Sequence, residues 1–330
     1  MPGGLGGRGS CQYRRARAKV PGTVNRTLTL WLLGDGKPGH ENQSLGLAEA
    51  IGRRVPCAVH RISLAGGTGW LRRLRTAHAA STRFPPPDWI IAAGHSTHVP
   101  LLSLARKHRA RSIVLMRPSL PLAWFDVCIA PSHDFPHAPG RDNVILTRGA
   151  LNRVEAPDLA EKTGKLILIG GPSKTHAWDG VALLQMLAKA TDRGGWELTD
   201  SRRTPKDFLT DARALLPGVT VFSHQDTPED WLPGKLRAAK EVWVTEDSVS
   251  MVYEALTSGA RVGLLPLPRR KQNARVLNGI DRLAAEGFLT PYETWRNTER
   301  LPSPPEILRE ADRCAALLCN RFHPDPGTHA

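Results

Sequence analysis

The chain has 330 residues, which is more than one hydrophobic core usually serves, so two domains of roughly 150 residues each are expected. Apolar residues make up 41% of it, but no apolar run approaches the roughly 18 to 20 residues that a membrane-spanning helix needs. Lys and Arg outnumber Asp and Glu by 45 to 31. The resulting net charge of +14 favours a polyanionic neighbour such as nucleic acid, an anionic membrane or a phosphorylated ligand.

Nucleic acid is the weakest of these three partners. The basic residues are scattered, with local groups at 72–75, 106–111 and 269–271 that solvated faces largely explain. Only three tyrosines and seven phenylalanines are present for base stacking. We therefore expect no nucleic-acid partner.

The five cysteines show neither CxxC spacing nor a disulfide-dense pattern, and an odd number is typical of a reducing cytosol. A zinc site is not expected. Residues 1–26 are rich in Gly and Arg and lack the apolar segment of a secretory signal, so a flexible tail is predicted. A transit peptide is the alternative, because the tail contains no Asp or Glu.

The first ordered unit reads as strand, loop and helix. A β-prone run at 28–33 stops at the glycine-rich segment 34–40, and apolar residues then recur at helical spacing as far as Ile51, with Asn42 or Ser44 as caps. The alternation continues in chain order. Strands are expected at 59–64, 89–94, 112–116 and 127–130, with helices at 70–80 and 99–107.

A second series of the same kind begins with a strand at 165–169. Further strands are expected at 196–200, 219–223, 241–245 and 262–265, with helices at 181–190, 206–215, 248–258 and 272–286. This alternation predicts an α/β fold of two Rossmann-like domains that face each other across a cleft. The expected division is a tail at 1–26, an N-terminal domain at 27–155, a C-terminal domain at 156–304, and a helix and tail at 305–330 that cross back to the N-terminal domain.

Parallel sheets bind their ligands at the carboxyl ends of their strands. Four loops at such strand ends carry polar side chains in this sequence. In the first loop, Asp35, Lys37 and His40 supply an acid, a cation and a titratable base, while Gly36 and Gly39 let the backbone approach a ligand. The loop matches neither the Walker nor the GxGxxG pattern. A tight turn with solvated charges is the alternative.

The second and third loops offer hydroxyl groups beside glycines. His95 and Ser96 follow a buried strand, although Ser96 or Thr97 would serve equally well as an N-cap. The third loop contains Gly171, Ser173 and Lys174, which suit a diphosphate or its ribose. A structural turn accounts as well for any single residue of the third loop.

The fourth loop gives the strongest signal and leads into a helix. Ser248 and Ser250 stand at the helix start, where hydroxyls and free N–H groups hold a phosphate, and the carboxylate of Glu254 is placed to accept hydrogen bonds from ribose hydroxyls. The alternative is an N-cap with a solvated Glu254. The predicted ligand-binding set of the C-terminal half also includes Thr245, Asp247, Met251, Gln272 and Asn273.

The segments 34–44, 170–174 and 245–251 together resemble the bacterial branch of the mitochondrial fission "elongated mitochondria" factor family. The resemblance covers nearly all of residues 27–320, and it implies a relation to B-type (GT-B) glycosyltransferases. By that relation His40 matches a loop histidine facing acceptor and donor diphosphate, and Glu254 matches a ribose-binding acid. Asp35 and Lys37 depart from the mostly small residues of those enzymes.

The resemblance also implies an alternative, because plant members of the family are thought to be membrane-surface adaptors. The favoured prediction is a metal-independent glycosyltransferase that needs no cofactor and takes a sugar from a nucleoside-diphosphate donor to a lipid-linked or cell-envelope acceptor. His40 or Asp35 would be the base. The protein would be cytoplasmic and peripheral at the inner face of an anionic membrane, with nucleotide-sugar epimerisation as a third hypothesis.

Overall fold

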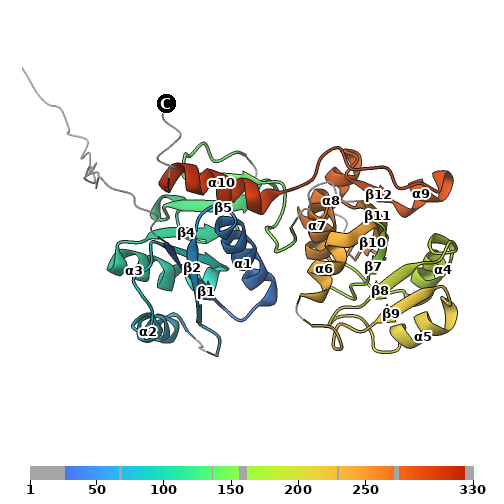
Figure 1. Ribbon diagram of the computed structural model, residues 1–330, viewed down its shortest axis with the longest axis horizontal. Coiled ribbons are helices and arrows are strands. Elements are labelled where there is room, and N and C mark those ends of the chain that lie inside the picture. The colour runs from blue at the N-terminus through green and yellow to red at the C-terminus, as the bar shows by residue number, and fades with distance from the viewer. Residues whose placement is uncertain are drawn as a thin grey trace, which may run out of the picture.

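The computed structural model describes residues 27–66, 69–135, 137–155, 162–228, 230–270 and 275–323. These residues form two six-stranded parallel sheets, each covered by helices on both faces, that lie side by side (Figure 1). The predicted α/β fold with two Rossmann-like domains is confirmed. Its strands are nearly continuously apolar, as expected where helices cover both faces of a parallel sheet; all five residues of β3 (Trp89–Ala93) are buried.

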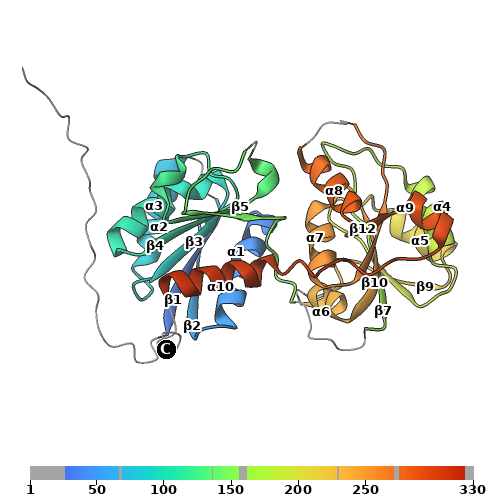
Figure 2. The same cartoon turned by 90° about the horizontal axis from the view of Figure 1, so that it is seen from above.

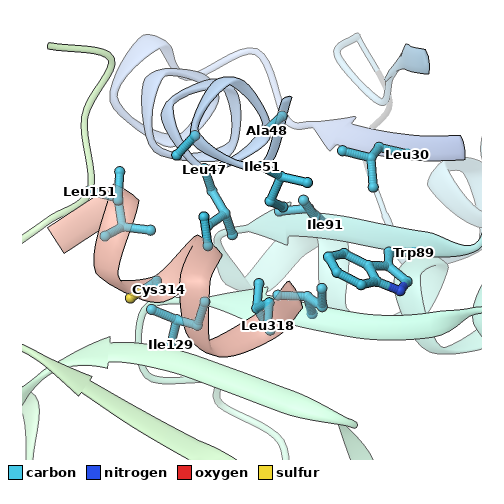
Figure 3. Packing of buried hydrophobic residues seen from close by; sticks show 14 of the residues in the cluster. Leu30, Leu47, Ala48, Ile51, Trp89, Ile91, Ile129, Leu151, Cys314 and Leu318 are labelled. Carbon is cyan, nitrogen blue, oxygen red and sulfur yellow. The ribbon is translucent and has the colours of Figure 1, made fainter. Parts of the chain in front are cut away.

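The N-terminal sheet has the order β2-β1-β3-β4-β5-β6. Its remaining strands are β1 (Leu28–Gly34), β2 (Cys57–Ser63), β4 (Arg111–Leu115), β5 (Val127–Pro131) and β6 (Val144–Thr147). The helices α2 (Trp70–Ser81) and α3 (His98–His108) cover one face of the sheet. On the other face, α1 (Pro38–Gly52) packs beside α10 (Glu310–Phe322), with Leu47, Ile51 and Leu318 among the buried contacts (Figure 3).

The C-terminal sheet has the order β12-β11-β10-β7-β8-β9. Its strands are β7 (Gly164–Leu168), β8 (Trp196–Thr199), β9 (Val219–Phe222), β10 (Ala239–Thr245), β11 (Arg261–Leu265) and β12 (Leu289–Pro291). One face carries α6 (Trp231–Ala238), α7 (Val249–Thr257) and α8 (Arg275–Ala285), which lie toward the N-terminal domain in both views (Figures 1 and 2). The other carries α4 (Gly180–Ala190), α5 (Phe208–Leu215) and α9 (Tyr292–Thr298).

The start of α1 differs from the sequence expectation. The helix begins at Pro38, whose fixed φ suits the first helical position, so Asn42 and Ser44 lie inside the helix and the prediction that they cap it is wrong. His40 therefore belongs to the first helical turn rather than to a free loop. Four elements were not expected: β6, α6, β12 and α9.

The two domains touch where the chain crosses between them. The Tyr253 hydroxyl on α7 donates to the Arg148 carbonyl at 3.0 Å, and the Asn152 amide donates to the Thr257 hydroxyl at 2.9 Å. A Cβ on Gly149 would lie 2.0 Å from the Tyr253 ring, so the backbone passes directly against that ring. These contacts fix α7 against the end of β6.

Arg153 and the C-terminal helix add to this connection. Arg153 donates to Glu49 of α1 at 2.9 Å and to Asp230, just before α6, at 3.4 Å. The chain leaves the C-terminal domain after α9 and continues into α10, which lies on the N-terminal domain (Figure 2). No helix of the described residues is long and apolar enough to span a membrane.

Candidate functional site

Polar groups from two loops meet at the carboxyl edge of the N-terminal sheet, and Asp35 is their centre. Its carboxylate accepts hydrogen bonds from His40 Nδ1 at 3.0 Å, from the Ser96 hydroxyl at 3.1 Å and from the Lys37 backbone at 3.2 Å. The Asp35 side chain is only 3% exposed. Parallel pairing of β1 with β3 brings the two loops together although they are 60 residues apart in sequence.

The bonds to Asp35 govern its protonation. Burial of the carboxyl opposes ionisation, but the charge of His40 and the hydrogen bonds from His40, Lys37 and Ser96 outweigh it and hold the pKa of Asp35 below its ordinary value. Asp35 is therefore an anion at neutral pH. It is suited to orient His40 and to stabilise its protonated form rather than to accept a proton itself.

His40 presents its second ring nitrogen for chemistry. Because Nδ1 faces the Asp35 carboxylate, the neutral form of the ring has its hydrogen on Nδ1 and its lone pair on Nε2. Nε2 forms no hydrogen bond with any described residue, and the side chain is 21% exposed. An acid, a histidine and an accessible nitrogen in this order form a general-base arrangement.

Gly94 allows the histidine to sit there. Its φ of +89° belongs to a region that L side chains rarely adopt, and a Cβ on it would lie 2.5 Å from His40 Nδ1 and 3.1 Å from Asp35 Oδ2.

Two residues near this edge, Met116 and Gln43, were not predicted as site residues. Met116 has a φ of +66° at the end of β4, and its sulfur accepts a hydrogen bond from the Gln43 amide at 3.6 Å.

The other predicted residues of this edge are mostly exposed. Gly36 has a φ of +81° and donates its N–H to Glu41, and Lys37 lies 3.9 Å from Asp35 with its side chain 62% exposed. Gly39 and His95 are exposed as well. Thr97 is buried, and its hydroxyl donates to the Gly94 carbonyl at 2.7 Å, which is a structural role.

The carboxyl edge of the C-terminal sheet is organised around two buried acids. The Asp247 side chain has no exposed surface and accepts from Gly171 N at 3.0 Å and from Arg203 at 2.7 Å. The Thr245 hydroxyl accepts from Gly170 N at 2.8 Å. These bonds fix the loop after β7 to the end of β10, so both side chains are engaged inside the protein.

Glu246 fixes the loop after β11 in the same way. It accepts from Leu267 N at 3.0 Å and from Arg269 at 2.7 Å, and Arg269 continues to Asp281 of α8 at 2.8 Å. Buried His176 lies 3.4 Å from Glu246. Desolvation lowers the pKa of His176 despite the opposing pull of the neighbouring acids, so the ring is neutral at pH 7. Sequence reasoning did not identify Arg203 and Arg269, because their partners lie in other loops.

The hydroxyls and the cation predicted for this edge are less engaged. Ser173 accepts from the backbone N–H groups of Thr175 and His176, and Lys174 is exposed and forms no hydrogen bond or ion pair with the described residues. Ser248 is the N-cap of α7 without a side-chain cap bond, and Ser250 is exposed in the first turn. Met251, one residue further on, is half-buried, and Gln272 and Asn273 lie outside the described residues.

Glu254 has an unusual environment for a carboxyl group. It lies on α7 beside Tyr253, is half-buried, and forms no hydrogen bond or ion pair with any described residue. Desolvation raises its pKa to about 7. A desolvated acid without a partner inside the protein is available to accept hydrogen bonds from a ligand.

A cavity of about 280 Å³ lies between the domains, close to Tyr253. The N-terminal domain contributes Ser132, His133 and Arg148, and α8 contributes Asn278 and Arg282. A Cβ on Gly279 would lie 3.6 Å from His133 Nδ1, so α8 lies against the loop after β5. Among the described residues no group of three or more His, Cys, Asp or Glu side chains is placed to hold a metal ion.

Comparisons with known proteins agree with this architecture. A putative UDP-N-acetylglucosamine 2-epimerase from Listeria monocytogenes has a similar fold, with a TM-score of 0.56 at 11% identity over 90% of this chain and 97% of the other. A second structure, of a UDP-N-acetylglucosamine 2-epimerase, gives 0.50 at 10% identity over 90% and 97%. The fold is thus of the GT-B type.

Sequence comparison gives the family. An uncharacterized protein of Rickettsia prowazekii, RP120, is 24% identical over 290 residues, covering 70% of this chain and 81% of that protein. The family model described as mitochondrial fission ELM1 matches residues 38–322. That match spans both domains and α10, and the chain therefore belongs to the mitochondrial fission ELM1 family.

Proposed function

We propose that this protein binds a nucleoside-diphosphate sugar between its domains and transfers the sugar to an acceptor hydroxyl. The observation that carries the proposal is the Asp35–His40 pair, in which Nε2 of a partly exposed histidine is left available at the carboxyl edge of a parallel sheet, where such sheets bind ligands. An adaptor has no physical need for an oriented general base. The fold, shared with nucleotide-sugar epimerases, supports a nucleotide-sugar ligand.

In the proposed reaction, His40 Nε2 removes the proton from the acceptor hydroxyl. The acceptor oxygen forms a bond to the anomeric carbon while the bond between that carbon and the diphosphate oxygen breaks, and the electron pair leaves with the nucleoside diphosphate. Asp35 stabilises the imidazolium. Lys174, the hydroxyls of Ser173, Ser248 and Ser250, and the N-terminus of α7 would oppose the charge on the leaving group.

The C-terminal domain is proposed to hold the nucleotide. Glu254 would accept hydrogen bonds from the ribose hydroxyls, which would relieve its lack of partners. Thr245 and Asp247 would act indirectly, because their bonds to Gly170 and Gly171 shape the diphosphate loop. Gly171 cannot carry a Cβ there, since it would lie 2.2 Å from the Arg203 carbonyl.

The acceptor is proposed to be lipid-linked or part of the cell envelope and to be met at the cytoplasmic face of an anionic membrane. The net charge of +14 supports an anionic surface as a partner. The proposal of a membrane partner is independent of the proposal of a nucleotide-sugar donor. An experiment can refute either one without the other.

A ligand screen followed by a turnover assay tests the proposal. Nucleotides and nucleotide sugars would be screened by thermal shift, where a ligand at 100 times its dissociation constant stabilises the fold by about 2.7 kcal/mol. Release of nucleoside diphosphate from the bound donor would then be measured with and without membrane extracts as acceptor. We expect one nucleotide sugar to bind and to be consumed.

Two results would favour other functions. Donor binding without turnover under any condition would support a non-catalytic adaptor at a membrane surface. Release of an altered sugar nucleotide instead of free nucleoside diphosphate would support epimerisation. Absence of binding by every nucleotide sugar would refute the proposal.

A further inference from the structure

One face of the N-terminal domain exposes apolar side chains to solvent. Among the described residues, eight large apolar side chains are exposed, and five of these lie between residues 59 and 124. Trp70 and Leu71 begin α2, Val99 is in the first turn of α3, and Trp124 lies in the turn before β5; all four belong to the layer that covers one face of the sheet. The two tryptophans are 58% and 59% exposed.

Charge is strongly one-sided in the same part of the chain. Residues 57–126 contain ten Arg and Lys and only two acids, Asp88 and Asp126. Both acids are engaged: Asp88 accepts from Thr29 N, and Asp126 accepts from Ser112 and Arg111. Seven of the cations lie on α2, on α3 or in the turns that follow them: Arg72, Arg73, Arg75, Arg83, Arg106, Lys107 and Arg109.

The opposite face of the same sheet is built differently. There Arg53 of α1 donates to Asp312 of α10 at 2.7 Å, and Arg313 donates to Glu310 at 2.6 Å. Arg53 and Arg313 on that face are thus paired with acids within the protein. The α2–α3 face carries seven cations, and it points away from the C-terminal domain in both views (Figures 1 and 2).

A hollow of about 630 Å³ lies beside α3 on this face. Leu102, Ala105 and Trp124 line it together with Arg106, Arg109 and Asp126, whose carboxylate is engaged by Ser112 and Arg111. Neither Arg106 nor Arg109 forms an ion pair or hydrogen bond with a described residue. Cations are common at the end of a helix, so the end of α3 accounts for part of the charge. It does not account for an exposed tryptophan that lines the same hollow as these two guanidinium groups.

The backbone of Arg109 adds a second observation. Arg109 ends α3 with a φ of +56°, a left-handed conformation that glycine or asparagine usually supplies at this position. An arginine here incurs strain that a glycine would avoid. Its side chain has no ion pair or hydrogen bond with a described residue, so the guanidinium group is available to an anionic ligand.

We infer that the α2–α3 face docks on a bilayer that contains anionic phospholipid. Trp70, Leu71 and Trp124 enter the interfacial zone, where amphipathic aromatic rings are favoured. Arg106 and Arg109 hold one lipid phosphate at the hollow, and the remaining cations lie over the headgroups. The inference deepens the membrane component proposed above and is independent of catalysis, because the face lies away from the interdomain cavity.

Vesicle flotation of the full chain tests the docking face. The vesicles would contain phosphatidylcholine alone or mixed with phosphatidylserine, at low and at high salt. We expect the protein to float with the anionic vesicles at low salt and to dissociate at high salt, because each cation near such a surface strengthens binding roughly fivefold. Equal distribution between the two vesicle types at low salt would overturn the inference.

Matched variants test the assignment of residues. The double change Arg106→Glu and Arg109→Glu is expected to weaken vesicle binding by at least about tenfold. The double change Arg193→Glu and Arg300→Glu alters net charge equally on exposed residues of the C-terminal domain and should leave most binding intact. Equal losses in the two double variants would contradict a specific face.

Two further measurements separate this inference from the donor site. Trp124→Ser, at an exposed position, should weaken vesicle binding at intermediate salt, where part of the parent protein still binds. An unchanged vesicle affinity would exclude Trp124 from the docking face. Nucleotide-sugar affinity should be unchanged in all these variants. If no donor binds the protein, the flotation result still decides whether the face docks on a membrane.

Discussion

The carboxyl edges of the two sheets use buried acids for opposite purposes. At the N-terminal edge, Asp35 accepts a hydrogen bond from His40 Nδ1, and the second ring nitrogen of His40 has no partner among the described residues. At the C-terminal edge, Glu246 and Asp247 are bound by Arg269 and Arg203 and fix neighbouring loops, and the Asp247 oxygen without a partner among the described residues, Oδ1, is buried. A polar strand end is therefore not by itself a reactive site: what matters is whether an accessible group remains after the internal bonds are formed.

The role of the N-terminal edge is tested most strongly by removing His40 Nε2. His40→Ala should lower turnover by roughly 100- to 10,000-fold, the range for loss of a general base, with little change in donor affinity. Turnover would be measured as release of nucleoside diphosphate. If an established activity survives the change, the catalytic assignment fails and Asp35 becomes the next candidate.

A smaller loss is expected when His40 is displaced rather than removed. Gly94→Ala places a Cβ 2.5 Å from His40 Nδ1, and a displacement of about 1 Å costs roughly 100-fold in rate. Gly69→Ala is the matched control, because Gly69 has nearly the same φ of +88° but meets no atom within 4 Å. Similar losses in both variants would attribute the effect to backbone strain alone.

A change at the C-terminal edge should lower the free energy of unfolding. Asp247→Ala removes the partner of Gly171 N and of Arg203 and should lower the free energy of unfolding by about 2 kcal/mol. Urea denaturation measures this loss. Glu299→Ala, which breaks an exposed pair with Arg193, is the control and should change stability by less than about 1 kcal/mol. A stable Asp247→Ala protein would show that the loop does not depend on this acid.

A further effect concerns pH. Desolvation raises the pKa of Glu254 to about 7, so the folded state holds its proton at pH values where the unfolded state has lost it. Stability should therefore fall as the pH rises from about 4.5 to 7, by up to about 3 kcal/mol. Urea denaturation across this range should show a smaller fall for Glu254→Gln, and identical curves would contradict the assigned environment.

Much of the fold follows from local pattern, because continuous apolar runs between glycine-rich loops specify buried parallel strands. The missed elements are those with weak patterns: β12 has three residues, and α6 contains Pro233 and Gly234. The start of α1 was misplaced because the glycines around Pro38 indicate a loop, whereas the proline at N1 begins the helix.

The candidate site was predictable in its residues more than in their roles. Asp35, His40 and Ser96 are near strand ends in sequence, and parallel pairing brings them together. The partners of Asp247 and Glu246 were not predictable, because Arg203 and Arg269 reach them from loops 44 and 23 residues away. Long-range ion pairs leave no periodic signal in a single sequence.

The division of roles between the two sheet edges is tested by the donor affinities of Glu254→Ala and His40→Ala, measured by calorimetry with the nucleotide sugar found in the screen. We expect Glu254→Ala to weaken the affinity by about tenfold, the equivalent of one hydrogen bond to a charged group, and His40→Ala to leave it unchanged. Both variants should retain the fold. Unchanged affinity in Glu254→Ala would contradict the division of roles between the two sheet edges.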